Sequence, residues 1–149
     1  MDDPYDLERY VRAQDPVFAQ VCAELAAGHK QSHWMWFIFP QLRGLGSSPM
    51  AQRYAIGSAD EARAYLEHRL LGERLRTCTQ LVNRIENRTV QAIFGYPDYL
   101  KFHSSMTLFA RAAAHAAEPF GEALAKYFAG EEDPLTRELL NHPKKSRSP

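Results

Sequence analysis

Residues 71–85 read Leu-Gly-Glu-Arg-Leu-Arg-Thr-Cys-Thr-Gln-Leu-Val-Asn-Arg-Ile, which is the clearest helical pattern in the chain. The apolar residues recur in steps of four, three, four and three positions: Leu71, Leu75, Cys78, Val82 and Ile85. An α-helix turns once in about 3.6 residues, so this spacing places these side chains on one face. The stretch therefore predicts an amphipathic helix that packs its apolar face against a core.

Helix start and stop signals flank this stretch on both sides. Ser58 and Glu61 form a capping-box pattern, which predicts a helix that breaks near His68. A shorter helix is expected around Leu7–Val11, and the helix after it should stop at Gly28. Other starts are expected where a proline, with or without a capping residue before it, opens an apolar periodic run. These starts are Asp15-Pro16, Ser48-Pro49, Pro97-Asp98, Pro119 and Asp133-Pro134.

No alternating run of apolar and polar residues is long enough to predict a strand, although residues 36–39 could form a short extended piece. We therefore predict an all-α fold, a compact single domain of about seven or eight helices over residues 1–141. Residues 142–149 contain only His, Pro, Lys, Ser and Arg, and we expect them to form a disordered basic tail.

The composition is that of an ordinary globular domain, and it argues against two classes of partner. The chain has 149 residues, of which 45% are hydrophobic and 24% charged, with 18 basic and 18 acidic side chains. This balance lacks the broad positive field that favours nucleic acids or acidic membranes, so we expect neither as a partner. A local arginine-lined pocket for a phosphate stays possible, because the balance is global and a pocket is local. The oligomeric state is left open.

Neither the cysteines nor the N-terminus indicates a cofactor, a metal site or export. Cys22 and Cys78 both fall within amphipathic helical patterns, and we expect buried free thiols. No Cys/His spacing fits a zinc site, so no metal and no cofactor are predicted. The acidic start of the chain is not a signal peptide and no apolar stretch reaches membrane-spanning length, so we expect a cytoplasmic location.

Residues 30–41, Lys-Gln-Ser-His-Trp-Met-Trp-Phe-Ile-Phe-Pro-Gln, combine both tryptophans of the chain with polar side chains. Two interpretations are open. The indoles can be the centre of the core, as large aromatics usually are. Alternatively, the polar neighbours, which need hydrogen bonds if they are buried, indicate a pocket wall that orients a planar ligand. In that interpretation the candidate ligand-binding residues are Lys30, His33, Trp34, Trp36 and Gln41.

A glycine-rich loop, Gly44-Leu-Gly-Ser-Ser48, follows this segment. Gly44 and Gly46 permit a positive φ or a close approach of the backbone, and the helix after Ser48 offers free N–H groups to an anion. Gly44, Gly46 and Ser47 are therefore candidate ligand-binding residues. The alternative is an ordinary tight loop capped by Ser48, because the loop matches neither the phosphate-loop nor the dinucleotide pattern.

A polar stripe lies on the helix expected to begin at Asp98. Asp98, Lys101 and Ser105 recur at helical spacing, with Ser104 beside them. Serines in mid-helix disfavour the helix slightly unless their hydroxyls have a function, so Lys101, Ser104 and Ser105 are candidate ligand-binding residues. Asp98 and Lys101 could equally be no more than a surface ion pair.

Several segments together resemble one known family. The most specific is Ser32-His-Trp-Met-Trp-Phe-Ile-Phe-Pro-Gln41. The others are Tyr54-Ala55-Ile56, Glu61-Ala62, Tyr65-Leu66, Leu71–Leu75, Ile93-Phe94-Gly95 and Lys101–Phe109. Over roughly Leu7–Leu140, the chain looks like the domain-of-unknown-function 1810 family of mostly bacterial and fungal proteins, sometimes mislabelled calpastatin. The resemblance implies a compact, mainly helical fold and no established activity. The chain departs from the family pattern at His68-Arg69, where the family usually has His-Pro, and in the tail after Asn141.

The order of an aromatic segment, a Glu-Ala helix and a Gly-Glu-Arg-Leu helix is also similar to the helical N-glycosidase-like domains linked to NAD and ADP-ribose metabolism. This likeness implies that Trp34 or Trp36 stacks on a base and that a carboxylate acts on the glycosidic bond. The candidate catalytic residues are Glu61 and Asp98. The residues left to hold a phosphate or ribose are Lys30, Lys101 and Ser105. The catalytic motif of those domains is not matched residue by residue.

Three functional hypotheses follow. The first is an enzyme that acts on a small nucleotide-like or phosphorylated metabolite. The second is a non-catalytic ligand-binding or protein-interaction module, and the third is a structural helical domain whose aromatic segment is core. The first hypothesis requires that four residues converge on one solvent-reachable cavity: His33, Gln41, Lys101 and Ser105.

Overall fold

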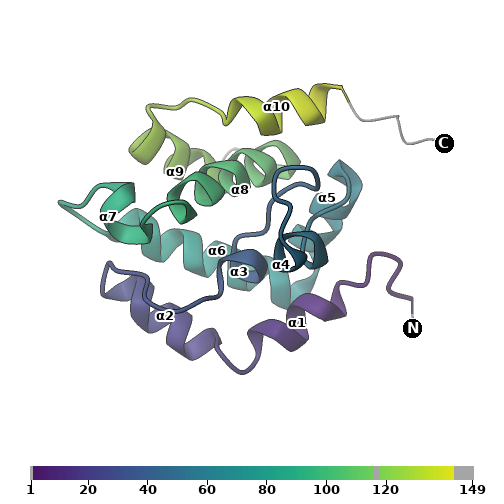
Figure 1. Cartoon of the computed structure of the whole chain (residues 1–149), viewed down its shortest axis with the longest axis horizontal. Helices are drawn as coiled ribbons and strands as arrows, with labels where there is room; N and C mark the ends of the chain where they lie inside the picture. The colour runs from purple at the N-terminus through teal and green to yellow at the C-terminus, as the bar shows by residue number, and fades with distance from the viewer. Residues whose placement is uncertain (1, 116–117, 143–149) are drawn as a thin grey trace.

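The computed structural model describes residues 2–115 and 118–142, and within these ranges the chain forms ten α-helices and no β-strand (Figure 1). The expected all-α fold is confirmed, with more helices than the seven or eight that the sequence indicated. Of the expected disordered tail, only His142 lies within the described residues.

The helices follow one another in chain order with short connections. They are α1 (Glu8–Gln14), α2 (Phe18–Ala26), α3 (Met35–Ile38), α4 (Pro49–Arg53), α5 (Ala59–Glu67), α6 (Arg69–Arg84), α7 (Val90–Phe94), α8 (Asp98–Ala112), α9 (Pro119–Phe128) and α10 (Pro134–Asn141).

Two helices in the middle of the molecule, α6 and α8, hold the others together. Helices α5 and α9 each pack against both of them, α2 packs on α6, and α10 packs on α8. Figure 1 accordingly shows α1 and α2 along one side and α10 along the opposite side, with α6 and α8 between them. The space between these helices is filled by aromatic and aliphatic side chains. The largest fully buried ones include Trp34, Tyr10, Tyr65, Phe39, Phe102, Phe109 and Phe120.

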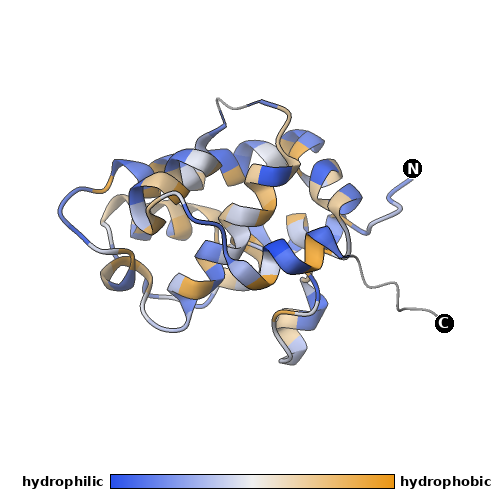
Figure 2. Cartoon of the chain, turned by 90° about the horizontal axis from the view of Figure 1, so that it is seen from above, coloured by the Kyte–Doolittle hydropathy of each residue, from blue (hydrophilic) through white to orange (hydrophobic). Residues whose placement is uncertain are grey.

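The amphipathic stretch that begins at Leu71 forms most of α6, as predicted. Leu71, Leu75, Cys78 and Val82 are all buried, and Ile85 is the C-terminal capping residue of the helix. In Figure 2 the longer helices carry both hydrophobic and hydrophilic residues, in keeping with one apolar face on each. Each described helix is too short or too polar to cross a lipid bilayer.

The predicted break at His68 is confirmed, and a single residue makes it. His68 ends α5, where its N–H donates to the carbonyl of Ala64 at 2.9 Å. Its Nδ1 then accepts the N–H of Leu71 at 3.1 Å and so caps α6. Gly72 lets the two helices meet closely, because a Cβ at this position would lie 2.2 Å from the carbonyl oxygen of Leu66.

Two helices and one helix start differ from the sequence prediction. Residues 36–39, which could have formed a short extended piece, lie mostly in the helix α3, and α7 was not expected. Both helices are too short for apolar periodicity to reveal them. Helix α7 is fixed instead by Thr89, whose hydroxyl accepts the N–H of Ala92 at 3.0 Å. The Asp15-Pro16 pair does not open α2, because Asp15 ends α1 and α2 begins at Phe18.

Candidate functional site

Part of the predicted pocket wall comes together at the start of α8. Asp98 lies between two lysines, with its Oδ2 at 2.8 Å from Lys30 Nζ and its Oδ1 at 3.6 Å from Lys101 Nζ. Each ammonium also lies over an indole. Lys30 Nζ is 5.1 Å from the Trp34 ring centre, and Lys101 Nζ is 5.5 Å from that of Trp36. Both ammonium groups are therefore engaged by a carboxylate and an aromatic face inside this lysine cluster.

Glu24, which the sequence analysis did not single out, organises the aromatic segment from α2. Its Oε1 accepts the indole N–H of Trp34 at 2.9 Å and the backbone N–H groups of Gln31 and Ser32 at 2.8 and 3.0 Å. The Ser32 hydroxyl and the Gln20 side chain donate to its other oxygen. Burial raises the pKa of Glu24, but these hydrogen bonds outweigh it and lower the pKa to about 2. Glu24 is therefore ionised at neutral pH and acts as a structural anion rather than a proton donor.

The two indoles differ in exposure. Trp34 is 1% exposed and belongs to the core, whereas Trp36 is partly exposed and packs against the core from outside. His33 is exposed. Gln41 is half-buried, and its carbonyl accepts the N–H of Ile56 at 2.8 Å.

The glycine-rich loop has a packing explanation. Gly44 has a φ of +105°, and a Cβ on Gly46 would lie 2.7 Å from the Cβ of Ala51. The carbonyl of Ser47 accepts a side-chain amide from α4 at 2.9 Å, and Ser48 Oγ accepts the N–H of Ala51 at 3.1 Å. These contacts are those of an ordinary tight loop capped by Ser48, which was the alternative to a ligand-binding loop.

Ser104 and Ser105 lie inside the molecule. The hydroxyl of Ser104 donates to the carbonyl of Leu100 at 3.2 Å and to Asp133 Oδ2 at 3.3 Å. Ser105 is 0% exposed, and its hydroxyl has no hydrogen-bond partner among the described residues. A side chain sealed from solvent cannot line a solvent-reachable cavity, so the convergence that the enzyme hypothesis requires is not observed.

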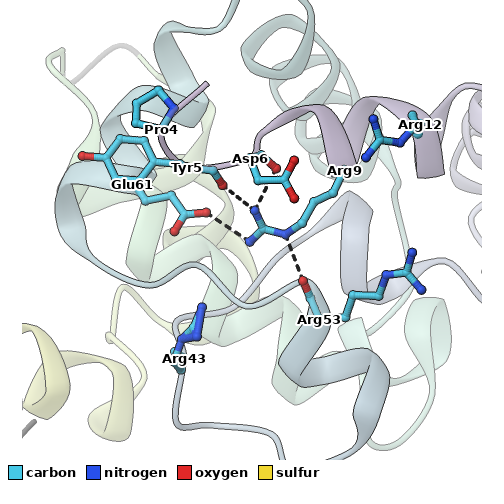
Figure 3. A pocket seen from close by; sticks show the side chains of 8 residues that line it. All are labelled: Pro4, Tyr5, Asp6, Arg9, Arg12, Arg43, Arg53 and Glu61. Carbon is cyan, nitrogen blue, oxygen red and sulfur yellow. Dashed lines mark hydrogen bonds and ion pairs between the residues drawn. The ribbon is translucent and has the colours of Figure 1, made fainter. Parts of the chain in front are cut away.

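A different set of residues lines a pocket of about 500 Å³, and its walls are rich in arginine (Figure 3). The walls come from the N-terminal segment, α1, the segment between α3 and α4, and the facing parts of α4 and α5. The lining residues are Pro4, Tyr5, Asp6, Arg9, Arg12, Arg43, Arg53 and Glu61. Four guanidinium groups and two carboxylates line this arginine pocket, so it carries an excess of positive charge. Of the predicted site residues, it contains only Glu61.

Arg9 crosses the arginine pocket and ties its walls together (Figure 3). Its Nη1 donates to the carbonyls of Tyr5 and Asp6 at 2.6 and 2.9 Å. Its Nε donates to the carbonyl of Arg53 at 2.9 Å, and its Nη2 reaches a carbonyl of the segment between α4 and α5 at the same distance. Nη2 also forms an ion pair with Glu61 at 3.2 Å. The side chain thus fixes the backbone of three neighbouring segments.

Glu61, one of the two candidate catalytic residues, is held on both sides. Its Oε2 pairs with Arg9, and its Oε1 accepts the N–H of Gly57 at 2.8 Å. The N–H of Glu61 donates to Ser58 Oγ at 3.1 Å, as the capping-box pattern predicts, but its carboxylate bonds Gly57 rather than the N–H of Ser58. Only 7% of the side chain is exposed. These contacts make Glu61 a structural carboxylate at the edge of the pocket.

Arg12, Arg43 and Arg53 are the exposed arginines of the pocket. Within residues 2–115 and 118–142, none of their guanidinium groups has a hydrogen bond or an ion pair; that of Arg53 lies over the Tyr54 ring at 5.5 Å. Sequence reasoning missed them because they come from three separate segments and share no local motif. Only the assembled fold brings them to one pocket.

Comparison with known proteins identifies the family. The model of a family described as a protein of unknown function (DUF1810) matches residues 4–140. The chain belongs to the DUF1810 family. The crystal structure of the conserved hypothetical protein Rv1873 from Mycobacterium tuberculosis is similar to this DUF1810 chain, with 59% sequence identity and a TM-score of 0.91. The similarity covers 93% of the DUF1810 chain and 99% of the other. Curated proteins gave no match. These findings describe a fold and name no activity, so the function of this DUF1810 chain has to be argued from its own residues.

Proposed function

We propose that this protein binds a small phosphorylated metabolite of nucleotide-like size in the arginine pocket. The observation that carries the proposal is the set of three exposed guanidinium groups, of Arg12, Arg43 and Arg53, that form no hydrogen bond or ion pair with a described residue. A guanidinium can bind two phosphate oxygens through parallel N–H bonds, which are stronger than bonds between neutral groups. The pocket volume of about 500 Å³ falls within the range of roughly 300–1,000 Å³ that is usual for small-molecule sites.

The fixed backbone around Arg9 supports the same proposal. The carbonyls of Tyr5, Asp6 and Arg53 are all held by this one guanidinium. The walls of the pocket are therefore in place before a ligand arrives, which lowers the entropy cost of binding. Asp3 adds to this rigidity from the N-terminal side, because its Oδ1 accepts the N–H of Leu7 at 2.7 Å.

The contacts of the two candidate catalytic residues favour binding over bond cleavage by these residues. Cleavage of an N-glycosidic bond needs an acid, a base or an oriented water. Both oxygens of Glu61 are engaged, by Arg9 and Gly57, and Asp98 lies between two lysines outside the arginine pocket. Neither carboxylate is therefore free to exchange a proton with a ligand held by the exposed arginines.

Calorimetric titration with inorganic pyrophosphate and with ADP-ribose tests the proposal. We expect both probes to bind the wild-type protein and to bind the double variant Arg43→Gln, Arg53→Gln much more weakly. Hydrogen bonds to charged groups contribute about 1.5–3 kcal/mol each, so the loss of both arginines should weaken binding by about a hundredfold or more. The matched control is the double variant Arg69→Gln, Arg84→Gln, which removes the same charge from exposed positions of α6.

The control decides how a loss of binding is to be understood. If both double variants lose affinity equally, the ligand responds to net charge and not to the pocket, and the proposal fails. It also fails if neither probe raises the melting temperature of the wild type at millimolar concentration. If the wild type releases nicotinamide from NAD, the proposal of a binding module is wrong and the protein is an N-glycosidase.

A further inference from the structure

One carboxylate of the arginine pocket, that of Asp6, is not explained by the binding of a phosphate. Asp6 lines the pocket with an exposed side chain, which Figure 3 shows between Tyr5 and Arg12. Its carboxylate forms no hydrogen bond and no ion pair with any residue of the ranges 2–115 and 118–142. The other carboxylate of the pocket differs, because both oxygens of Glu61 are engaged. Asp6 therefore presents two acceptor oxygens that are available to a ligand.

The backbone of Asp6 is fixed, although its carboxylate is not engaged. Its N–H donates to the carbonyl of Asp3 at 3.0 Å, and its carbonyl accepts a hydrogen bond from Arg9 Nη1 at 2.9 Å. All three nitrogens of the Arg9 guanidinium donate to carbonyls of the pocket walls, and one also pairs with Glu61. The guanidinium of Arg9 thus holds the backbone of Asp6 and leaves its carboxylate for another partner.

A carboxylate beside phosphate-binding arginines restricts which ligand can bind there. An ionised carboxylate accepts hydrogen bonds but cannot donate them, and it repels the oxygens of a phosphate. Two neighbouring hydroxyl groups of a sugar can donate to it, and acidic residues hold ribose hydroxyls in this way in dinucleotide-binding folds. The pocket therefore suits a ligand that presents a phosphate to the arginines and a diol to Asp6.

We propose that Asp6 selects, among small phosphorylated metabolites, those that carry a ribose, by accepting hydrogen bonds from the 2′ and 3′ hydroxyl groups. The phosphates of the same ligand bind the guanidinium groups of Arg12, Arg43 and Arg53. The inference rests on the proposed function, because it assigns a second part of the same ligand to the same pocket. A volume of about 500 Å³ gives a sugar room beside the phosphates.

Calorimetric titration with ADP and with 2′,3′-dideoxy-ADP isolates the diol, since the two probes share the base and the phosphates. The buffer contains EDTA, so that no divalent cation bridges Asp6 to a phosphate. We expect the wild type to bind ADP at least about tenfold more tightly than dideoxy-ADP, because hydrogen bonds to a charged group are the stronger ones. In Asp6→Asn this preference should fall to about threefold or less. Asp6 has a φ of +53°, which asparagine also tolerates, so the variant keeps the backbone conformation.

Inorganic pyrophosphate separates a loss of diol recognition from damage to the pocket. Because pyrophosphate has no sugar, Asp6→Asn should bind it at least as tightly as the wild type does, now that a negative charge near the arginines is removed. The matched control is Glu73→Gln, which removes the same charge from an exposed position of α6. This control should keep the wild-type preference for ADP over dideoxy-ADP.

The wild type alone can overturn the inference. Equal affinities for ADP and dideoxy-ADP would show that no diol is recognised, whether or not Asp6→Asn folds. The inference is also wrong if Asp6→Asn weakens the binding of pyrophosphate and ADP by the same factor, or if the preference for ADP appears only when magnesium replaces EDTA. If pyrophosphate binds and the diol makes no difference, the proposed function stands and only this inference fails. If neither pyrophosphate nor ADP binds, both fail.

Discussion

Glu24 shows how one buried carboxylate can hold a segment that has almost no regular structure of its own. The connection between α2 and α3 has no helix, so its N–H groups need partners from elsewhere, and Glu24 takes those of Gln31 and Ser32. The sequence contained a signal for this role: Glu24 stands three residues after Val21 and directly before Leu25, on the side of α2 that is buried. A charged residue there is unusual. The sequence could not reveal its partners, because only the folded connection brings Trp34 back onto α2.

Replacement of Glu24 with Gln should destabilise the protein by roughly 2–3 kcal/mol at neutral pH, because the neutral side chain loses the charge and one acceptor oxygen. The effect should depend on pH. The pKa of Glu24 is about 2 in the folded protein against an ordinary 4.5, so its stabilisation is complete above about pH 4.5 and is lost as the pH falls towards 2. Urea unfolding of wild type and Glu24→Gln across this range measures the difference, which should shrink on acidification. A difference that stays constant with pH would contradict this role.

Among the helices, those with a capping residue and a long apolar face were predictable. Helix α6 follows its periodicity, and α10 begins where the Asp133 carboxylate accepts the N–H of Thr136 at 2.9 Å. The helices α3 and α7 have four and five residues, which is less than two turns, so no periodicity could mark them. The sequence also did not predict the close contact between α5 and α6. A glycine inside a helical pattern does not show which neighbouring atoms a Cβ at that position would clash with.

Replacement of Gly72 with Ala should destabilise the protein by roughly 2–3 kcal/mol, because the new Cβ would lie 2.2 Å from a backbone oxygen of α5, and that oxygen moves only with its helix. Thermal or urea unfolding measures the effect. The matched control is Gly121→Ala in α9, where a Cβ would have nothing within 4 Å. Since alanine favours a helix over glycine, this control should stabilise the protein by up to about 1 kcal/mol. The interpretation fails if both substitutions change stability in the same direction.

For the whole molecule, the functional candidate depends on segments that are distant in sequence. The balanced composition left room for a local positive pocket, but it could not place one. Residues 9, 12, 43 and 53 come together because α1, the segment before α4 and the end of α4 line one pocket, and no pattern within a single segment predicts this. The lysine cluster at Asp98 was easier to foresee, since the spacing of Asp98 and Lys101 suggested an ion pair.

Replacement of Arg9 with Lys should destabilise the whole fold by about 3 kcal/mol. A single ammonium cannot reach all the carbonyls that the guanidinium engages, and Glu61 would keep a buried charge with a poorer partner. Arg12→Lys on the same helix is the control, because the exposed Arg12 side chain has no hydrogen bond or ion pair among the described residues. Urea unfolding should show a lower midpoint for Arg9→Lys and little change for Arg12→Lys. Equal midpoints for the two variants would show that Arg9 does not hold the pocket walls.

The residue that joins α5 to α6 also determines which residues fit at the position after it. His68 has a φ of −67° and a ψ of 122°, which is the conformation that a residue before a proline has to adopt. Position 69 is the first residue of α6, and the N–H of a first helical residue has no partner within the helix. Proline, which lacks this N–H, therefore fits at the position. Arg69 therefore occupies a position whose backbone conformation would also suit proline. The His68 imidazole alone caps α6, so the corner between α5 and α6 does not require a proline ring at position 69.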